Sequence, residues 1–249
     1  LLDATLMDGS RIVMTLGREV STKGSTFTIR RFRDEPFTPV DLLEFKTFSS
    51  MQIAFFWLAM QYGMSMLFVG GTASGKTTSL NACSLFLPWQ HKIVSIEETR
   101  ELNLPHPNWI PGCTRQGFGG EGSSGGGKAA GEVDMYDLLR AALRERPEYI
   151  IVGEIRGEEA YVLFQAMATG HTTYSTFHAD SIQSLVHRLE NKPIEIPRVL
   201  IPALDGISIQ IQTRVGGKRV RRNKAIVEII GIDPHSHELL TNEAFRWDN

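Results

Sequence analysis

The chain has 249 residues, of which 42% are hydrophobic and 22% are charged, a composition that excludes an intrinsically disordered protein. The net charge of −2 gives no general attraction to nucleic acid or to an anionic lipid surface. Cys83 and Cys113 lie far apart in the sequence, which excludes a disulfide scaffold and suits the reducing cytoplasm, and no signal peptide is predicted.

The first 36 residues predict short strands. RIVMTL and FTIRRF carry β-branched and aromatic residues, and glycine-containing turns separate them. A helix start follows, because Thr38 is an expected N-cap, Pro39 suits the first helical position and Asp41 can complete a capping box. We therefore place a domain boundary near Pro36.

One uncharged segment, MQIAFFWLAMQYGMSMLFVGG (51–71), has the length of a membrane span. Ser49 or Ser50 can cap a helix here, and Gly63 stands where that helix would end. The helical spacing of the apolar residues, and two glutamines that are costly in hydrocarbon, favour a buried helix followed by a core strand. We expect no transmembrane segment.

From residue 37 onward, predicted strands alternate with predicted helices, as is typical of an α/β fold with a mostly parallel sheet. The expected strands are Met64–Val69, Lys92–Ile96, Tyr149–Val152 and Thr172–Phe177. The expected helices are Thr77–Phe86, Met135–Glu145, Glu158–Ala168 and Ile182–Glu190. An alternating apolar run from residue 207, a Gly-Gly pair and the basic stretch KRVRRNKAIVEII predict a final β-hairpin.

Three stretches carry weaker signals. The glycine-rich TRQGFGGEGSSGGGKAAG (114–131) predicts a flexible solvated loop, and a mobile contact loop is the alternative. Arginines crowd the N-terminal piece, where they form a solvated face or, alternatively, face a phosphate site across the domain boundary. We interpret the basic group on the hairpin as charges that protect an edge strand from aggregation. That group comprises Arg214, Lys218, Arg219, Arg221, Arg222 and Lys224.

The strongest signal is GGTASGKT (70–77), which matches the phosphate-binding pattern G-x-x-x-x-G-K-[ST] between an apolar strand and a helix. The glycines let backbone N–H groups turn toward phosphate oxygens, and the helix adds its positive N-terminal end. Lys76 would contact the β- and γ-phosphates, and Thr77 would bind Mg²⁺. The expected nucleotide-binding residues are Gly71, Thr72, Ala73, Ser74, Gly75, Lys76, Thr77 and Thr78.

Hydrolysis also needs a carboxylate that holds Mg²⁺ or orients water. Glu154 follows the apolar strand of YIIVGEIRG, and open α/β sheets bind ligands at the carboxyl ends of their strands. Glu97 and Glu98 end another apolar strand in KIVSIEETRE, and one of them could polarise the attacking water. The competing interpretations are a solvated strand-end carboxylate for Glu154 and a surface acidic pair for Glu97 and Glu98.

The segment GHTTYSTFHAD (170–180) contains two histidines. His171 and His178 are an odd number of residues apart, so on one strand they point to opposite faces, which argues against a shared metal. His178 lies at the carboxyl end of the strand, where its imidazole can respond to a γ-phosphate. A structural histidine is the plainer interpretation of His171.

The motifs GGTASGKTT, IEETRE, IIVGEIRG and TGHTTYSTFHADS resemble the four-part signature of the secretion ATPase superfamily, most closely its archaeal branch. These are motors of type II and type IV secretion, type IV pilus assembly and the archaellum. The resemblance covers essentially the whole chain. It implies a RecA-type P-loop motor domain over residues 37–249, ending in the basic hairpin. Residues 1–36 would be the end of a smaller α+β, PAS-like N-terminal domain, with a linker.

The resemblance also implies roles for single residues. DGSR and FTIRR resemble the arginine-finger region, with Arg31 as the alternative to Arg30. Thr77 and Glu154 would be the metal ligands, and Glu97 would orient water. The implied catalytic residues are Glu154, Glu97, Arg11, Arg30, His178 and His171.

The implied function is Mg²⁺-dependent ATP hydrolysis by a homo-hexameric ring in the cytoplasm. The ring would attach to the membrane through an inner-membrane platform protein and make no direct contact with nucleic acid. The first alternative is a nucleic-acid-translocating or conjugation-type ATPase, which the net charge of −2 weakens. A GTPase switch is a second, although NKPI (191–194) lacks the aspartate of the guanine-reading motif, and a small-molecule kinase is a third.

Overall fold

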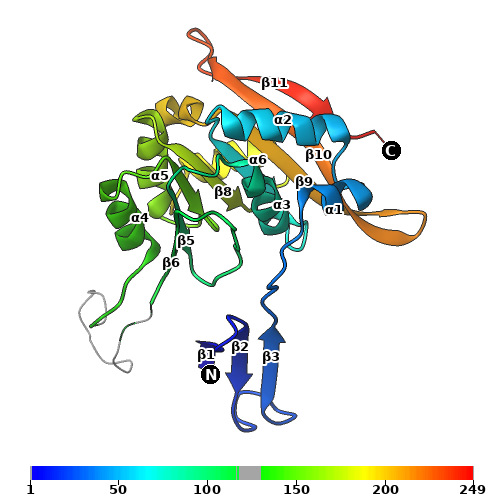
Figure 1. Cartoon of the computed structure of the whole chain (residues 1–249), viewed down its shortest axis with the longest axis vertical. Coiled ribbons are helices and arrows are strands. Elements are labelled where there is room, and N and C mark those ends of the chain that lie inside the picture. Colours follow the sequence, from blue (N-terminus) through cyan, green and yellow to red (C-terminus); the bar gives the residue numbers. More distant parts are fainter. Residues whose placement is uncertain (1, 116, 118–129, 249) are drawn as a thin grey trace.

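Most of the chain forms one sheet with helices on both faces, over the residues that the computed structural model describes, 2–115, 117 and 130–248 (Figure 1). Its strands are β4 (Met66–Gly70), β5 (Ile93–Glu97), β6 (Trp109–Cys113), β7 (Tyr149–Val152), β8 (Thr172–Phe177), β9 (Gly206–Val215), β10 (Lys218–Ile232) and β11 (Leu239–Arg246). They are ordered β11-β10-β9-β4-β8-β7-β5-β6 across the sheet. The strands from β9 to β6 run parallel, whereas β10 and β11 continue the sheet antiparallel.

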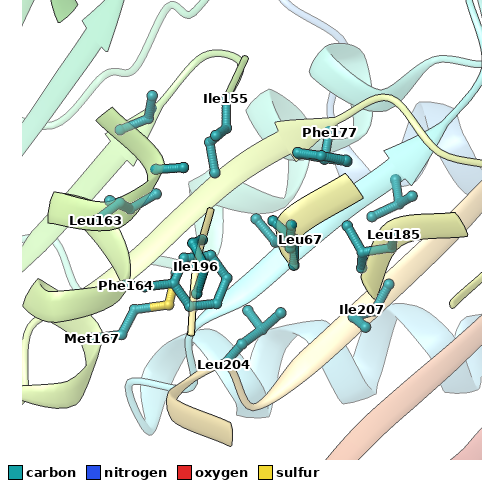
Figure 2. Close-up of a cluster of buried hydrophobic side chains, with 14 of the residues drawn as sticks. Leu67, Ile155, Leu163, Phe164, Met167, Phe177, Leu185, Ile196, Leu204 and Ile207 are labelled. Atoms are coloured by element: carbon teal, nitrogen blue, oxygen red, sulfur yellow. The ribbon is translucent and has the colours of Figure 1, made fainter. Parts of the chain in front are cut away.

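Side chains that alternate along the central strands enter two hydrophobic clusters, one on each face. On β4, Leu67 and Val69 belong to one cluster, and Met66 and Phe68 belong to the other. The first cluster (Figure 2) packs against α4 (Met135–Arg144), α5 (Glu159–Ala168) and α6 (Ile182–Glu190). The second packs against α1 (Pro39–Glu44), α2 (Ser50–Gln61) and α3 (Lys76–Cys83). Burial on both faces fixes the strands, so their carboxyl ends form a rigid edge.

A small antiparallel sheet lies beside this body and is joined to it by an extended segment (Figure 1). In its central pair of strands, Arg11 stands directly opposite Arg30, so both arginines emerge from the same face. The segment is tied back by a hydrogen bond of 2.7 Å from Asn103 Nδ2 to the carbonyl oxygen of Asp34. The strands of this sheet are β1 (Leu2–Thr5), β2 (Arg11–Thr15) and β3 (Thr26–Arg30).

The structure contains the strands and helices that the sequence predicts from residue 37, with small shifts at their ends. Thr38 and Asp41 form the expected capping box, and Ser49 caps α2 with Gln52. The phosphate-loop helix begins at Lys76, ends at Cys83 and passes into a 3₁₀ turn, Ser84–Phe86. β9 and β10 form the predicted hairpin, whereas the edge strands β6 and β11 were not predicted.

Two further sequence predictions concern the glycine-rich loop and the absence of a membrane span. Most of the glycine-rich loop predicted over residues 114–131 lies outside the described residues, so that prediction stays untested. None of the described helices has the length and hydropathy that a membrane span requires.

Candidate functional site

The phosphate loop connects β4 to α3, and its conformation depends on two glycines. Gly75 has a φ of +96°, in the left-handed region where side chains are strained. A side chain at Gly70 could not fit, because its Cβ would lie 2.4 Å from the carbonyl oxygen of Gln210. Ser74 Oγ donates to the carbonyl oxygen of Gly71 at 2.8 Å, which closes the loop. The curled backbone is the shape required to hold a phosphate group.

Lys76 lies inside this loop and is largely buried. Its ammonium group donates to the carbonyl oxygen of Gly71 at 3.0 Å. Burial lowers the pKa of Lys76, and the Glu154 carboxylate opposes that change. A largely buried cation with no carboxylate hydrogen bond among the described residues favours an anionic ligand at this place.

Four segments with predicted site residues lie at one edge of the sheet because they follow four neighbouring strands. The phosphate loop follows β4, His178 follows β8, Glu154 follows β7 and Glu97 ends β5. The carboxyl ends of parallel strands share one edge of the sheet, where open α/β folds bind ligands. The predicted positions of Lys76, Glu154, Glu97 and His178 relative to the strands are therefore present in the structure.

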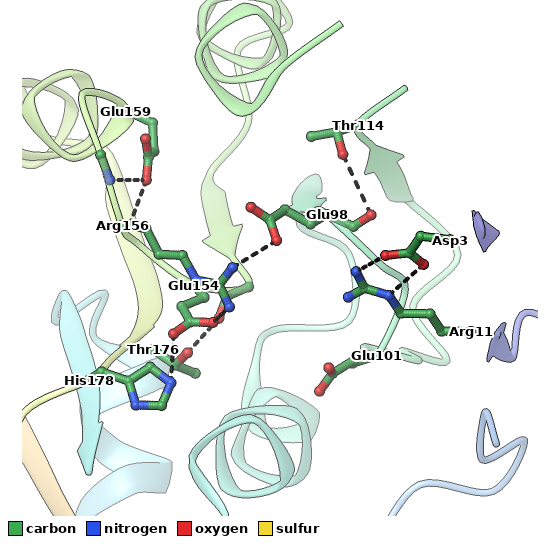
Figure 3. A network of polar contacts seen from close by, with 12 residues as sticks. Asp3, Arg11, Glu98, Glu101, Thr114, Glu154, Arg156, Glu159, Thr176 and His178 are labelled. Atoms are coloured by element: carbon green, nitrogen blue, oxygen red, sulfur yellow. Dashed lines mark hydrogen bonds and ion pairs between the residues drawn. The ribbon is translucent and has the colours of Figure 1, made fainter. Parts of the chain in front are cut away.

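Glu154 is held between two cationic or ionisable partners (Figure 3). Its Oε2 lies 2.5 Å from Arg156 Nη2, and its Oε1 lies 2.8 Å from His178 Nε2. Arg156 also reaches Glu98 at 3.0 Å, so one guanidinium bridges the two acidic motifs. Arg156 and His178 therefore hold the Glu154 carboxylate in place.

Glu97 is buried, with only 2% of its surface exposed. Its Oε1 accepts hydrogen bonds from the N–H groups of Glu101 (3.0 Å) and Leu102 (3.1 Å). Burial raises the pKa of Glu97 to about 7, and these two bonds oppose the rise. Oε2 has no partner among the described residues, so Glu97 presents one free oxygen of near-neutral basicity. The alternative interpretation of Glu97 and Glu98 as a surface acidic pair is therefore wrong for Glu97, whereas Glu98 is exposed.

The two histidines lie at opposite ends of β8. Burial and Lys76 lower the pKa of His178, and Glu154 raises it less. His178 Nε2 lies beside Glu154 Oε1, and the two groups form an ion pair when the ring is protonated. His171 precedes the strand, and its backbone N–H donates to the carbonyl oxygen of Ala166 at 2.9 Å. The structure therefore brings His178, and not His171, to the phosphate loop.

The N-terminal arginines approach the same place from the small sheet. Arg30 forms an ion pair of 2.8 Å with Glu101. Arg11 pairs with Asp3 of its own sheet, as Figure 3 shows. A small cavity of about 90 Å³ brings these two predicted fingers to the predicted metal ligands and carboxylates. Its lining includes Arg11, Arg30, Thr77, Glu97, Glu98, Glu154 and Arg156.

A larger cavity of about 880 Å³ extends from the phosphate loop to α1 and the β9–β10 hairpin. Five cationic side chains line it against two carboxylates, so it favours a polyanion. These charged residues are Arg30, Lys76, Arg156, Arg219, Arg221, Glu101 and Glu154. The lining includes Arg30 and not Arg31, the alternative finger. Phe37, Leu42, Phe45 and Val220 form an apolar end.

The comparisons with known proteins decide the family. A family model described as "Type II/IV secretion system protein" matches residues 6–241. The chain belongs to this family. The predicted resemblance to secretion ATPases is therefore confirmed.

Individual members of the family support the assignment. An uncharacterized protein of Methanocaldococcus jannaschii is 47% identical over 210 residues, which cover 84% of this chain and 75% of that protein. The type IV secretion system protein PtlH of Bordetella pertussis is 34% identical over 68% of this chain and 51% of its own length. This chain thus spans about half the length of PtlH.

The fold is shared with a solved structure. The pilus retraction motor PilT, solved with bound ADP, superposes with a TM-score of 0.61 at 21% identity, over 94% of this chain and 64% of PilT. The predicted fold class, a mostly parallel α/β core of the RecA type, is confirmed.

Sequence reasoning missed several residues of this secretion-family site. Arg219 and Arg221 belong to the group interpreted as edge-strand charges, yet both line the large cavity. Phe37 and Phe45 pack edge to face, with ring centroids 5.2 Å apart, at its apolar end. The spacing of Arg219 and Arg221, two residues apart on one strand, was the available signal that they share a face.

Proposed function

We propose that this secretion-family chain is the motor of a Mg²⁺-dependent ATPase. The observation that carries the proposal is the convergence of the phosphate loop, Glu154 and His178 around one positively charged cavity, with Glu97 in a small cavity that shares Thr77 and Glu154 with it. Its volume of about 880 Å³ suits a nucleotide. The two ends of the cavity also match the two ends of ATP. The base would lie against Phe37 and Phe45, and the phosphates would lie in the loop around Lys76.

Thr77 and Glu154 fit the Mg²⁺ that such a motor requires. Both line the large and the small cavity, and they offer a hydroxyl and a carboxylate, the oxygen ligands that Mg²⁺ prefers. Glu154 Oε1 is buried and lies 2.8 Å from His178 Nε2, a contact that a bound Mg²⁺ would replace. When bound, Mg²⁺ would neutralise charge on the phosphate groups.

The chain's own residues then divide the work of hydrolysis. Lys76 binds the phosphates. The Glu97 carboxylate accepts the proton of the attacking water at its Oε2, and the pKa of Glu97, about 7, suits a general base. Arg30 leaves Glu101 and stabilises the charge that develops on the transferred phosphoryl group. His178 responds to the presence of the γ-phosphate, and its contact with Glu154 transmits that response to the catalytic carboxylate. The roles proposed for Arg11 and His171 rest on the family resemblance.

We further propose that the chain works in a homo-hexameric ring in the cytoplasm, attached to an inner-membrane platform protein. The uncovered side chains of the small sheet support an interface with a neighbour, since Phe27 is 73% exposed and Ile29 50% exposed. The relatives PtlH and PilT point to secretion or pilus machines. A conjugal transfer protein, TrbB, is also similar, at 27% identity, which keeps conjugation-type transport as the alternative.

Nucleotide binding and phosphate release test this proposal. The chain should release phosphate from ATP in the presence of Mg²⁺ without any acceptor, and chelation of Mg²⁺ should stop the release. Lys76→Ala should raise the Kd for ATP by about 100-fold, because it removes a buried charge that pairs with phosphate in the ground state. The matched control Lys92→Ala changes a lysine outside the cavity and should bind ATP normally. Absence of ATP binding by the unaltered chain would refute the proposal.

A further inference from the structure

The β9–β10 hairpin brings Arg221 against the phosphate loop. Arg221 Nε donates to the carbonyl oxygen of Ala73 at 2.9 Å. Its Cδ lies 3.1 Å from the place that a Cβ at Gly75 would occupy. Ala73 has a φ of +59°, so this hydrogen bond holds a residue of the loop in a left-handed conformation. The hairpin therefore contacts the loop at the two residues where its backbone is most unusual.

Arg221 is also free to bind an anion. Two of the three other arginines of the cavity are paired, Arg30 with Glu101 and Arg156 with Glu154. For Arg221, no carboxylate partner exists over residues 2–115, 117 and 130–248. A guanidinium has five N–H donors, and the bond to Ala73 uses one of them. Its terminal nitrogens remain available to phosphate oxygens.

The neighbours of Arg221 place it at the junction of the two ends of the cavity. Val220, the preceding residue, also lines the cavity, and Arg222, the next residue, donates to the carbonyl oxygen of Phe45 at 3.1 Å. Ala73 and Gly75, which Arg221 contacts, belong to the phosphate end. A group between the base and the phosphate loop lies nearest to the first phosphate after the ribose.

The polar layer below the loop comes from the same hairpin. Gln210 on β9 is fully buried, and its amide oxygen lies 3.6 Å from the Cβ position of Gly75. Neither of its amide atoms has a hydrogen-bond partner in the described structure. Burying an amide without hydrogen bonds costs free energy. A small movement of the loop or of Arg221 that gave the Gln210 amide a hydrogen-bond partner would therefore be favourable. The hairpin thus places two polar side chains, Arg221 and Gln210, against the phosphate loop.

We propose that Arg221 is a nucleotide-binding residue. Its guanidinium binds the α-phosphate, and its hydrogen bond to Ala73 stabilises the conformation of the phosphate loop. This proposal rests on the proposed function, because it assumes a nucleoside di- or triphosphate in the cavity. It makes the β9–β10 hairpin part of the binding site. Because ADP and ATP share the α-phosphate, Arg221 contributes equally to the binding of both.

Titration of fluorescent ADP and ATP analogues with four proteins tests the proposal. Arg221→Ala should raise the Kd of both nucleotides by at least about tenfold and leave the ATP-to-ADP ratio unchanged. Arg221→Lys should lose less, because it retains the charge but not the guanidinium fork. The matched control Arg214→Ala removes an arginine of the same hairpin that lies outside the cavity lining, and it should bind like the unaltered chain.

Each other outcome has a definite meaning. Unchanged affinity in Arg221→Ala overturns the proposal, and a loss confined to ATP overturns the assignment to the α-phosphate. Thermal unfolding without nucleotide shows that the variants are folded, and a misfolded Arg221→Ala leaves Arg221→Lys to decide. If the unaltered chain binds neither nucleotide, the proposed function fails first. If it binds both and Arg221→Ala binds equally well, only the present proposal fails.

Discussion

The protonation of Glu97 gives a prediction whose size follows from the structure. Burial raises its pKa from an ordinary 4.5 to about 7, which corresponds to about 3 kcal/mol. Between these two values the folded chain keeps a proton that the unfolded chain has lost. The free energy of unfolding therefore falls as pH rises through this window and receives no further change from Glu97 above it. Glu97→Gln cannot ionise and should lack this loss.

Urea unfolding, followed by tryptophan fluorescence at several pH values, measures the effect. The stability of Glu97→Gln relative to the unaltered chain should increase by about 3 kcal/mol between pH 4.5 and pH 8. Glu44→Gln, which alters an exposed glutamate on α1, is the control and should show no such trend. If the difference in free energy of unfolding between Glu97→Gln and the unaltered chain stayed constant across this range, the pKa of Glu97 would not be raised. Glu97 would then be unsuited to the role of general base.

Two further predictions concern the groups around the phosphates. His178→Ala should narrow the affinity difference between ATP and ADP more than His171→Ala does, because only His178 contacts Glu154 at the loop; equal small effects in nucleotide titrations would indicate two structural histidines. Arg30→Ala should leave ATP binding largely intact and reduce turnover by about 10³-fold or more, as for an arginine finger. Mixed rings of Arg30→Ala and Lys76→Ala subunits should stay inactive, because Arg30 lines its own chain's cavity; activity that returns on mixing would show that a neighbour supplies the finger.

The sequence predicted the central part of the fold because its signals are local. Apolar strands followed by helix caps, such as Thr38 with Asp41, fix the elements whatever surrounds them. β6 was missed because Pro111 and Gly112 disfavour strands, and Pro111 is tolerated there because β6 pairs on one side only, with β5. β11 was missed because its apolar residues do not alternate clearly with polar ones.

The site was predictable only as far as it follows strand ends. Glu154 and His178 come directly after apolar strands, so their place could be read from the chain. Arg221 could not be placed, because its contact with Ala73 joins residues 148 positions apart and depends on the hairpin's pairing with β4 through β9. The raised pKa of Glu97 likewise depends on packing that no spacing pattern contains.

The separation of binding from turnover at Glu154 tests the central claim most directly. Glu154→Gln keeps the size of the side chain and removes the charge that faces the phosphate loop. ATP binding should remain close to that of the unaltered chain, and Mg²⁺-dependent phosphate release should fall by at least about 100-fold. Near-normal phosphate release by Glu154→Gln would contradict the account, because hydrolysis would then not depend on this carboxylate.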